Sequence, residues 1–260
     1  MEQGAWRREW KTDEERYNAA FHWEIASRPI TIRQSRVTSP GTVGGTLWDS
    51  SLVLAKYLER QYHPDGLAGR RIIELGSGCG LVGIAAVLMG AEVVMTDVYA
   101  LDQLQQNIDD NVPAELRQRA AVAHYSWGTE PSTMGEAGQG RWDMILGSDV
   151  VYDYRFMRPL IKTLHLLAAA DTQIVLAIKR HDHESRQVFA RTLQEFSFVA
   201  RKVREEDLDA TYRDEEIMVV NISRHQAPTD DGEGGETQNS ATADDDALTD
   251  GDDDDIDTLW

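Results

Sequence analysis

Cysteine is almost absent from this chain, which has a single one, Cys79, among 260 residues. One cysteine excludes an internal disulfide, so we expect an intracellular protein, cytoplasmic with the nucleus as the alternative. Long apolar runs are also lacking, since none reaches the roughly 18 residues that indicate a membrane-spanning helix. Residues 1–16 are charged and have no apolar core of a signal peptide. We therefore expect no membrane partner.

Basic residues are scarce: 26 Lys and Arg face 45 Asp and Glu, which gives a net charge of −19. Residues 226–260 contain thirteen acidic residues and no Lys or Arg, and account for all but −6 of that charge. Such a segment cannot bury enough apolar surface to fold, so we expect a disordered, solubilising tail; the alternative is an arm that docks on a basic partner. This composition argues against nucleic acid as a partner.

The most informative segment runs from Glu74 to Gly80 and reads Glu-Leu-Gly-Ser-Gly-Cys-Gly. An apolar run that predicts a buried strand precedes it, an apolar stretch that predicts a helix follows it, and Asp97 closes the next apolar run. Strand, glycine turn, helix, strand and acid form the plan of a nucleotide-type cofactor site. Glycines admit a ligand close to the backbone, and the start of a helix offers free N–H groups. A carboxylate at the second strand can accept ribose hydroxyls.

Two cofactor classes use this plan. A dinucleotide brings a pyrophosphate, which Glu74, two residues before Gly76, would repel. The overlapping frame from Gly78 to Gly83 also fits the dinucleotide fingerprint, so the glycine pattern alone does not decide. S-adenosyl-L-methionine has an ammonium, a sulfonium and no phosphate. Glu74 and the spacing to Asp97 therefore favour this cofactor, and a purely structural glycine turn is the remaining alternative.

The chain divides into a lead-in helix and strand (residues 1–40), a catalytic domain (41–225) and the acidic tail. Trp6, Trp10, Tyr17 and Phe21 recur at near-helical spacing, which predicts a helix that packs on the domain, and residues 28–35 alternate as an exposed strand does. Further along, the pattern predicts strands at 71–75, 92–96, 120–124, 143–148, 172–178, 198–204 and 216–222, and helices at 49–60, 81–89, 100–111, 156–167 and 184–196.

This alternation predicts an α/β fold with a Rossmann-like, seven-stranded, mostly parallel sheet and helices on both faces. In such sheets ligands bind beyond the carboxyl ends of the strands. The residues that follow each strand are therefore the candidate site residues: Gly76 to Gly80, Asp97, Ser126-Trp127 and Ser148-Asp149.

With these strand ends identified, residues 44–198 resemble a known family. The segments that carry the resemblance are Gly45 to Ser51, Glu74 to Gly83, Thr96-Asp97, Asn107 to Asn111, Trp127-Gly128 and Trp142 to Tyr152. Together they are similar to the seven-strand protein-lysine methyltransferases with an Asp-x-x-Tyr motif, the methyltransferase-like twenty-one group. Cys79 stands where a threonine is usual, the run from Lys179 to Glu184 replaces a frequent pair of arginines, and the tail is outside the family pattern.

The resemblance implies a class I methyltransferase that uses S-adenosylmethionine and acts on a lysine of a chaperone, an ATPase or an elongation factor. Separately, we expect a monomer, with the oligomeric state left open. Asp97 would hold the ribose hydroxyls, Trp127 would stack near the adenine, and Glu74 would lie under the methionine ammonium. Core packing is the alternative for each tryptophan. The cofactor contacts that the resemblance implies are Trp48, Glu74, Gly76, Ser77, Gly78, Asp97, Trp127 and Ser148.

Asp149 and Tyr152 form the Asp-x-x-Tyr motif and are the predicted catalytic residues. A lysine amine, with an ordinary pKa of ~10.4, must lose its proton before it attacks a methyl group. An aromatic mouth favours the neutral amine by desolvation, Asp149 can orient it, and the Tyr152 ring can contact a cationic amine. The alternative is that Asp149 caps a helix beginning near Phe156 and that Tyr152 only packs.

Several other hypotheses remain open. His181 and His183 are too few for a metal site, so we expect a solvated loop and no metal. We assign no role to Asn107 and Asn111. The acceptor could instead be a small molecule or a histidine, and the chain could be a non-catalytic adaptor or an NAD-dependent oxidoreductase. Loops 129–141 and 204–215 would select the substrate.

Overall fold

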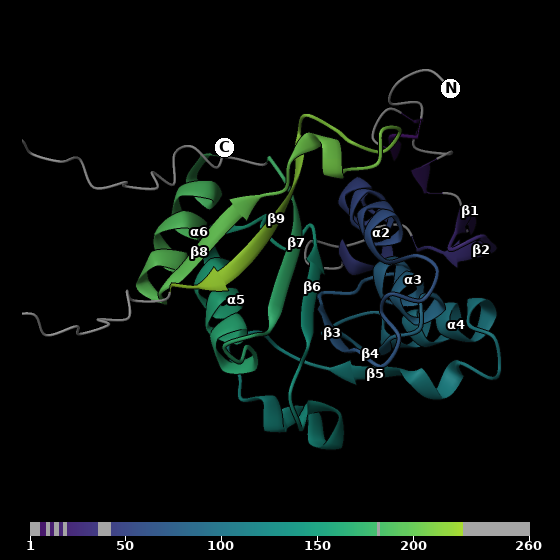
Figure 1. Cartoon of the computed structure of the whole chain (residues 1–260), viewed down its shortest axis with the longest axis horizontal. Coiled ribbons are helices and arrows are strands. Elements are labelled where there is room, and N and C mark those ends of the chain that lie inside the picture. The colour runs from purple at the N-terminus through teal and green to yellow at the C-terminus, as the bar shows by residue number, and fades with distance from the viewer. Residues whose placement is uncertain are drawn as a thin grey trace, which may run out of the picture.

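The computed structural model describes residues 6–8, 11–12, 16–17, 20–35, 43–180 and 183–225. A seven-stranded sheet crosses this part of the chain in the order β5-β4-β3-β6-β7-β9-β8 (Figure 1). Strand β9 is antiparallel to both of its neighbours, and the other pairs are parallel. The strands are β3 (Arg71–Leu75), β4 (Glu92–Asp97), β5 (Ala120–His124), β6 (Met144–Ser148), β7 (Gln173–Lys179), β8 (Phe198–Lys202) and β9 (Ile217–Arg224).

Helices cover both faces of the sheet because successive strand residues point to opposite sides. Ile72 of β3 packs in one core with α2, α3 and α4, whereas Ile73 packs in a second core with α5 and α6. Figure 1 shows these two helical layers on either side of the strands. The helices are α2 (Asp49–Tyr62), α3 (Leu81–Leu88), α4 (Leu101–Asn111), α5 (Tyr154–Leu167) and α6 (His183–Glu195).

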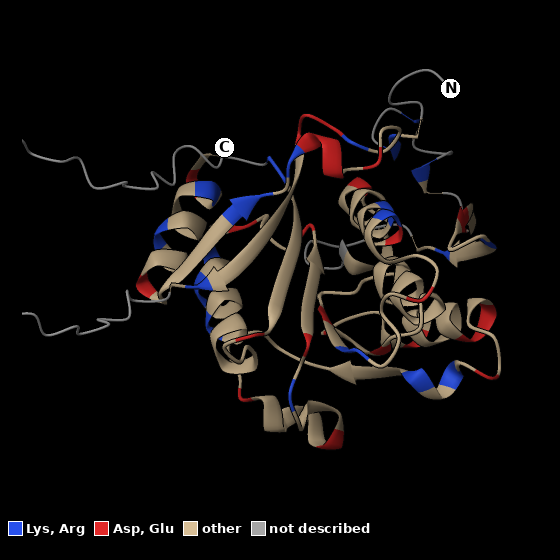
Figure 2. Ribbon diagram, viewed as in Figure 1, with Lys and Arg blue, Asp and Glu red and all other residues tan. Residues whose placement is uncertain are grey.

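The most apolar segments of the chain form the helix and the strands at the centre of the fold. Every residue of α3 is buried, as expected for a helix that is apolar on all sides. Figure 2 shows β6 and β7 without charged residues along most of their length, while charges lie on helices, loops and strand ends. All seven strands begin and end within two residues of their predicted positions. The predicted fold class is therefore confirmed.

The N-terminal region differs from the prediction. Phe21, expected in a helix, lies in β1 (Ala20–Ile25), which pairs antiparallel with β2 (Arg28–Arg33). Ala26 and Ser27 connect the two strands with φ of 52° and 57°, the left-handed geometry of a type I′ turn. The predicted strand is confirmed as β2, and the helix prediction is wrong over residues 20–25. Trp10 is outside the described residues.

The acidic tail, residues 226–260, also lies outside the described residues, as do His181 and Asp182. Among the residues that the structure does describe, no helix is long and apolar enough to cross a membrane. The same part of the chain has no group of three or more His, Cys, Asp or Glu side chains that could hold a metal ion.

Candidate functional site

The turn between β3 and α3 has a backbone conformation that glycine adopts most easily. Gly76, Gly78 and Gly80 have φ of 64°, 52° and 84°, all in the left-handed region. Space is also short, because a Cβ on Gly76 would lie 3.2 Å from the Trp127 ring. One on Gly78 would lie 2.9 Å from the Gly44 carbonyl oxygen. We call this turn, Gly76 to Gly80, the glycine cradle; it lies at the carboxyl end of β3.

Asp97, the last residue of β4, is bonded to the glycine cradle. Its Oδ2 accepts a hydrogen bond from the Gly78 N–H (2.9 Å), and its Oδ1 accepts from the N–H groups of Val98 (2.7 Å) and Tyr99 (3.0 Å). A carboxylate has about four acceptor positions, so about one, on Oδ2, is left for a ligand. Gly44 lies over this oxygen, since a Cβ on it would be 3.4 Å from Oδ2.

Glu74 lies beneath the glycine cradle and is 1% exposed. Its Oε2 accepts a hydrogen bond from the Gly83 N–H (3.0 Å) in the first turn of α3. Desolvation by burial raises the pKa of Glu74 to about 8, against the opposing hydrogen bonds of Ser77 and Gly83, and the Asp97 carboxylate raises it further. Glu74 therefore holds a proton at neutral pH in the structure as described, and a cation bound beside it would favour the ionised form at low dielectric.

Ser77 holds the glycine cradle on β4. Its N–H donates to the Thr96 carbonyl (2.8 Å), and its Oγ accepts from the Thr96 N–H (3.0 Å). The Ser77 hydroxyl donates to the Glu74 carbonyl oxygen (3.4 Å), which also accepts from the Thr96 hydroxyl (2.7 Å). The hydroxyl of Ser77 thus serves the framework of the turn, and its predicted contact with the cofactor stays a prediction.

Aromatic side chains lie beside the cradle. Trp127 is half-buried and packs edge to face with Phe156, with ring centroids 6.4 Å apart; Phe156 is 5.9 Å from the Tyr152 ring. In the described part of the chain, the exposed large apolar side chains all follow β4 or β6. This aromatic rim consists of Val98, Tyr99, Tyr154 and Phe156, which are 37%, 54%, 47% and 40% exposed.

Trp48 is half-buried immediately before α2. The Arg16 guanidinium lies 5.3 Å from the centroid of its ring. The adjacent Asp49 carboxylate accepts from the Arg8 N–H (2.8 Å) and pairs with the Arg7 guanidinium at 3.5 Å. These contacts fix the start of α2 against the N-terminal residues, and the cofactor contact of Trp48 stays a prediction.

Asp149 follows Ser148, the last residue of β6, in a left-handed conformation with φ of 57°. This conformation is uncommon for a residue with a Cβ, although Asp adopts it more readily than most residues, and it occurs often at functional positions. The Asp149 N–H donates to the Ala177 carbonyl of β7 (2.9 Å). Asp153, not Asp149, caps α5, because its side chain accepts from the Arg155 N–H (3.0 Å). The capping alternative for Asp149 is therefore wrong.

Tyr152 connects the two ends of the site. Desolvation raises the pKa of its phenol, and the negative charges of Asp153, Asp97 and Asp149 raise it further. The phenol is thus neutral at physiological pH, and the charges of both Asp97, at the cofactor end, and Asp149, at the acceptor end, raise its pKa. The structure brings together residues from β3, β4 and β6, as predicted from their strand-end positions.

Sequence reasoning missed two contributors to the site. Gly44 was not among the predicted site residues, yet it lies over the glycine cradle and Asp97. Asn107 received no role, yet it is fully buried and donates a hydrogen bond to the Cys79 carbonyl (2.8 Å). The repeat of amides at Gln103, Asn107 and Asn111 was the available signal.

With this geometry established, comparison with known proteins identifies the family. Residues 25–196 match the model of a family described as lysine methyltransferase. The chain belongs to this family. Its relatives include EEF1A lysine methyltransferase 3 of Xenopus tropicalis, which is 31% identical and aligns over 81% of this chain and 88% of its own. Protein N-lysine methyltransferase METTL21A of Mus musculus is 36% identical over 70% of this chain and 79% of its own.

The solved structures support the fold of this lysine methyltransferase. The T. thermophilus 16S rRNA N2 G1207 methyltransferase, solved with AdoMet and guanosine, has a TM-score of 0.55 at 17% identity. The match covers 80% of this chain and 50% of that one, and bears on the fold alone. Family membership confirms the resemblance and the predicted class, a protein-lysine N-methyltransferase. It leaves the NAD-dependent oxidoreductase without support.

Proposed function

We propose that this lysine methyltransferase transfers a methyl group from S-adenosylmethionine to a lysine of a cytoplasmic protein, at the carboxyl edge of the sheet. One observation carries the assignment of the site. The glycine cradle and Asp97 stand at the ends of β3 and β4, Asp149 and Tyr152 follow β6, and β3 lies between β4 and β6. Cofactor and acceptor can therefore meet across neighbouring strands. The single cysteine supports the cytoplasmic location.

The residues of the cradle fit the cofactor. Gly76 and Gly78 have φ of 64° and 52°, and a Cβ at either position would press on the Trp127 ring or the Gly44 oxygen, so the tight turn beside Asp97 requires glycine there. Asp97 has an acceptor position for a ribose hydroxyl, and Trp127 offers a flat apolar face for an adenine. In its ionised form, which a bound cation favours, Glu74 supplies negative potential that suits an ammonium and opposes a phosphate. S-adenosylmethionine supplies an electrophilic methyl group on its sulfonium.

The acceptor end of the site prepares a lysine for attack. The Tyr152 and Phe156 rings exclude water from a lysine amine that lies against them, which lowers the pKa of the amine and favours its neutral form. Asp149 accepts an N–H hydrogen bond and directs the nitrogen lone pair toward the methyl carbon. Positioning of this kind carries much of the rate advantage of a direct displacement. The lysine proton leaves to solvent before transfer.

For the substrate we propose EEF1A, the acceptor in the name of a relative that aligns with most of this chain. A chaperone or another ATPase is the second candidate. One surface at the carboxyl ends of the strands suits a protein rather than a small molecule, namely the aromatic rim, whose apolar side chains are exposed. A cavity of about 750 Å³ also lies at the carboxyl ends of β7 and β8, lined in part by Arg180, Lys202 and Glu215.

The test incubates the purified enzyme with methyl-labelled S-adenosylmethionine, EEF1A and a cytosolic extract, beside an Asp149→Ala control that still binds the cofactor. Label on a lysine of EEF1A that is lost in the control supports the proposal. Label on another protein replaces EEF1A as the substrate. Label confined to small molecules would overturn the protein acceptor, and failure to bind S-adenosylmethionine would overturn the proposed cofactor site.

A further inference from the structure

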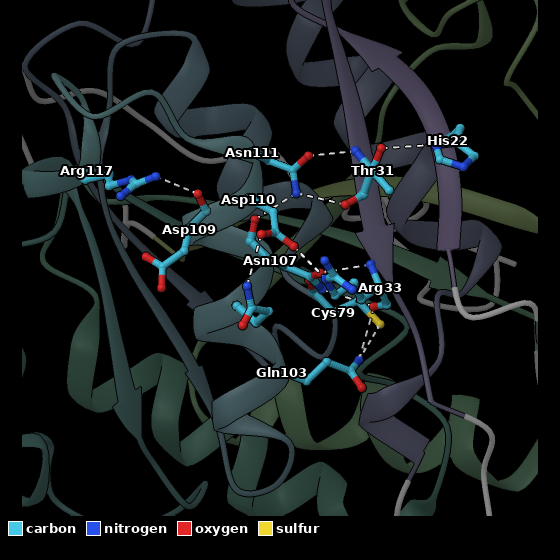
Figure 3. A network of polar contacts seen from close by, with 11 residues as sticks. His22, Thr31, Arg33, Cys79, Gln103, Asn107, Asp109, Asp110, Asn111 and Arg117 are labelled. Atoms are coloured by element: carbon cyan, nitrogen blue, oxygen red, sulfur yellow. Dashed lines mark hydrogen bonds and ion pairs between the residues drawn. The ribbon is translucent and has the colours of Figure 1, made fainter.

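Helix α4 presents a row of amide side chains that the proposed chemistry does not use. Gln103, Asn107 and Asn111 are spaced four residues apart, so they lie along one face of the helix (Figure 3). Asn107 is fully buried, and Gln103 and Asn111 are half-buried. A buried amide is costly unless both its oxygen and its nitrogen find partners.

Two of these amides pair with the open edge of β2. Asn111 accepts from the Thr31 N–H (2.6 Å) and donates to the Thr31 carbonyl (2.9 Å). Asn107 does the same with Arg33, at 2.8 Å and 3.1 Å. The two side chains thus take the place of a neighbouring strand and fix the β1–β2 hairpin on α4.

Asn107 and Gln103 also reach the cofactor site, whereas Asn111 does not. Asn107 Nδ2 donates to the carbonyl of Cys79, inside the glycine cradle (2.8 Å). Gln103 Nε2 donates to the Gly45 carbonyl (3.1 Å) and to the Arg33 carbonyl of β2 (3.3 Å), and it lies 3.4 Å from the Cys79 sulfur. The third contact of Asn111 is with its own helix, at the Asn107 carbonyl (2.7 Å). The row therefore clamps the cradle and the segment that covers it onto one helix.

We propose that Asn107 and Gln103 are positioning residues for S-adenosylmethionine, an inference that rests on the proposed cofactor site. They hold Cys79 and Gly45, and the neighbours of these residues, Gly78 and Gly44, bound the space beside Asp97. The two segments are closely packed there, because a Cβ on Gly78 would lie 2.9 Å from the Gly44 oxygen. A shift of a few tenths of an ångström between the two segments changes the room for the cofactor, although neither amide touches it.

The test compares Asn107→Asp with Asn111→Asp in the full chain. Both substitutions keep the oxygen that accepts from β2 and place a carboxylate against two carbonyl oxygens, so both weaken the docking of the hairpin. Only the first disturbs Cys79. The dissociation constant of S-adenosylmethionine, measured by titration calorimetry, should rise at least tenfold in Asn107→Asp and stay within twofold in Asn111→Asp. Thermal unfolding, recorded in parallel, should show a loss of stability in both.

A milder pair keeps the test valid if Asn107→Asp does not fold. Gln103→Ala should raise both the dissociation constant and the KM for S-adenosylmethionine and leave kcat unchanged. Gln106→Ala, whose parent side chain donates to Asp110 on the exposed face of α4, should change none of these. Equal effects of the two Asn variants, or a Gln103→Ala variant with the affinity of the parent, would overturn the positioning role. A parent protein that does not bind S-adenosylmethionine would overturn the cofactor site as well.

Discussion

Replacing Glu74 with glutamine should stabilise the protein at alkaline pH and weaken cofactor binding. Burial raises the pKa of Glu74 to about 8, from 4.5 in its ordinary state. Between these two values the carboxyl holds a proton in the folded protein and is ionised in the unfolded chain. The unfolding free energy that this group contributes is therefore fully present below pH 4.5 and is lost as the pH rises through about 8.

The size of the effect follows from the two pKa values. One proton of difference changes the unfolding free energy by about 1.4 kcal/mol per pH unit. From pH 6 to pH 8, allowing for partial ionisation near the folded-state pKa, the loss for this group is about 2 kcal/mol. Glutamine has the same shape, its oxygen can accept from the Gly83 N–H, and it does not ionise. The Glu74→Gln variant should therefore lack this loss.

Urea unfolding at pH 6, 7 and 8 measures the difference. The parent protein and a Glu92→Gln control, which changes an exposed carboxylate at the start of β4, should lose stability in parallel, while Glu74→Gln falls less steeply. If the unfolding free energies of the parent and Glu74→Gln fell equally steeply with pH, a protonated Glu74 would be refuted. The parent should also release a proton when it binds the cationic cofactor, which calorimetry in buffers of different ionisation enthalpy detects; Glu74→Gln should not.

Three further predictions concern other parts of the site. Asp149→Asn should retain S-adenosylmethionine binding but lower kcat for the protein substrate by about 10²-fold or more, because it removes an orienting carboxylate, and a radiolabel transfer assay measures this. Gly78→Ala should abolish cofactor binding in calorimetry, because a Cβ would press on Gly44 beside Asp97. The positive φ at this position should by itself lower the unfolding free energy by about 1–2 kcal/mol. Asp153→Ala should lower the unfolding free energy by about 1 kcal/mol through loss of the α5 cap, whereas Asp153→Asn should retain it in urea denaturation.

The sheet and the ends of its strands could be predicted because their signals are local. A buried parallel strand is a continuous apolar run, and the polar or glycine residue that ends each run also marks the edge where ligands bind. The positions of Glu74, Asp97 and Asp149 at or near the carboxyl ends of their strands could therefore be predicted from the order of residues alone. The sheet order and the antiparallel β9 required the structure, since no local pattern shows which strands become neighbours.

The hairpin and the amide row were missed for physical reasons. Ala26 and Ser27 form a type I′ turn without the Asn or Gly that usually marks one, and the surrounding aromatic spacing imitates a helix. Trp23 finds its partner far along the chain, where its Nε1 donates to the Tyr212 hydroxyl (2.8 Å). Asn107 looks like an ordinary helix-surface residue, because β2, the strand that buries it, comes from a region predicted as a separate lead-in.

Glu74 also bears on the choice of cofactor, because its charge has no structural need. Its Oε2 accepts from the Gly83 N–H, and a neutral amide oxygen could make this hydrogen bond and the one with Ser77 at no cost in ionisation. With a carboxyl group in that place, the folded protein loses stability as the pH rises toward 8. A bound cation reverses this balance, because it favours the ionised form and lowers the pKa. The methionine ammonium and sulfonium are such cations, whereas a pyrophosphate would raise the pKa further and bind more weakly as the pH increases.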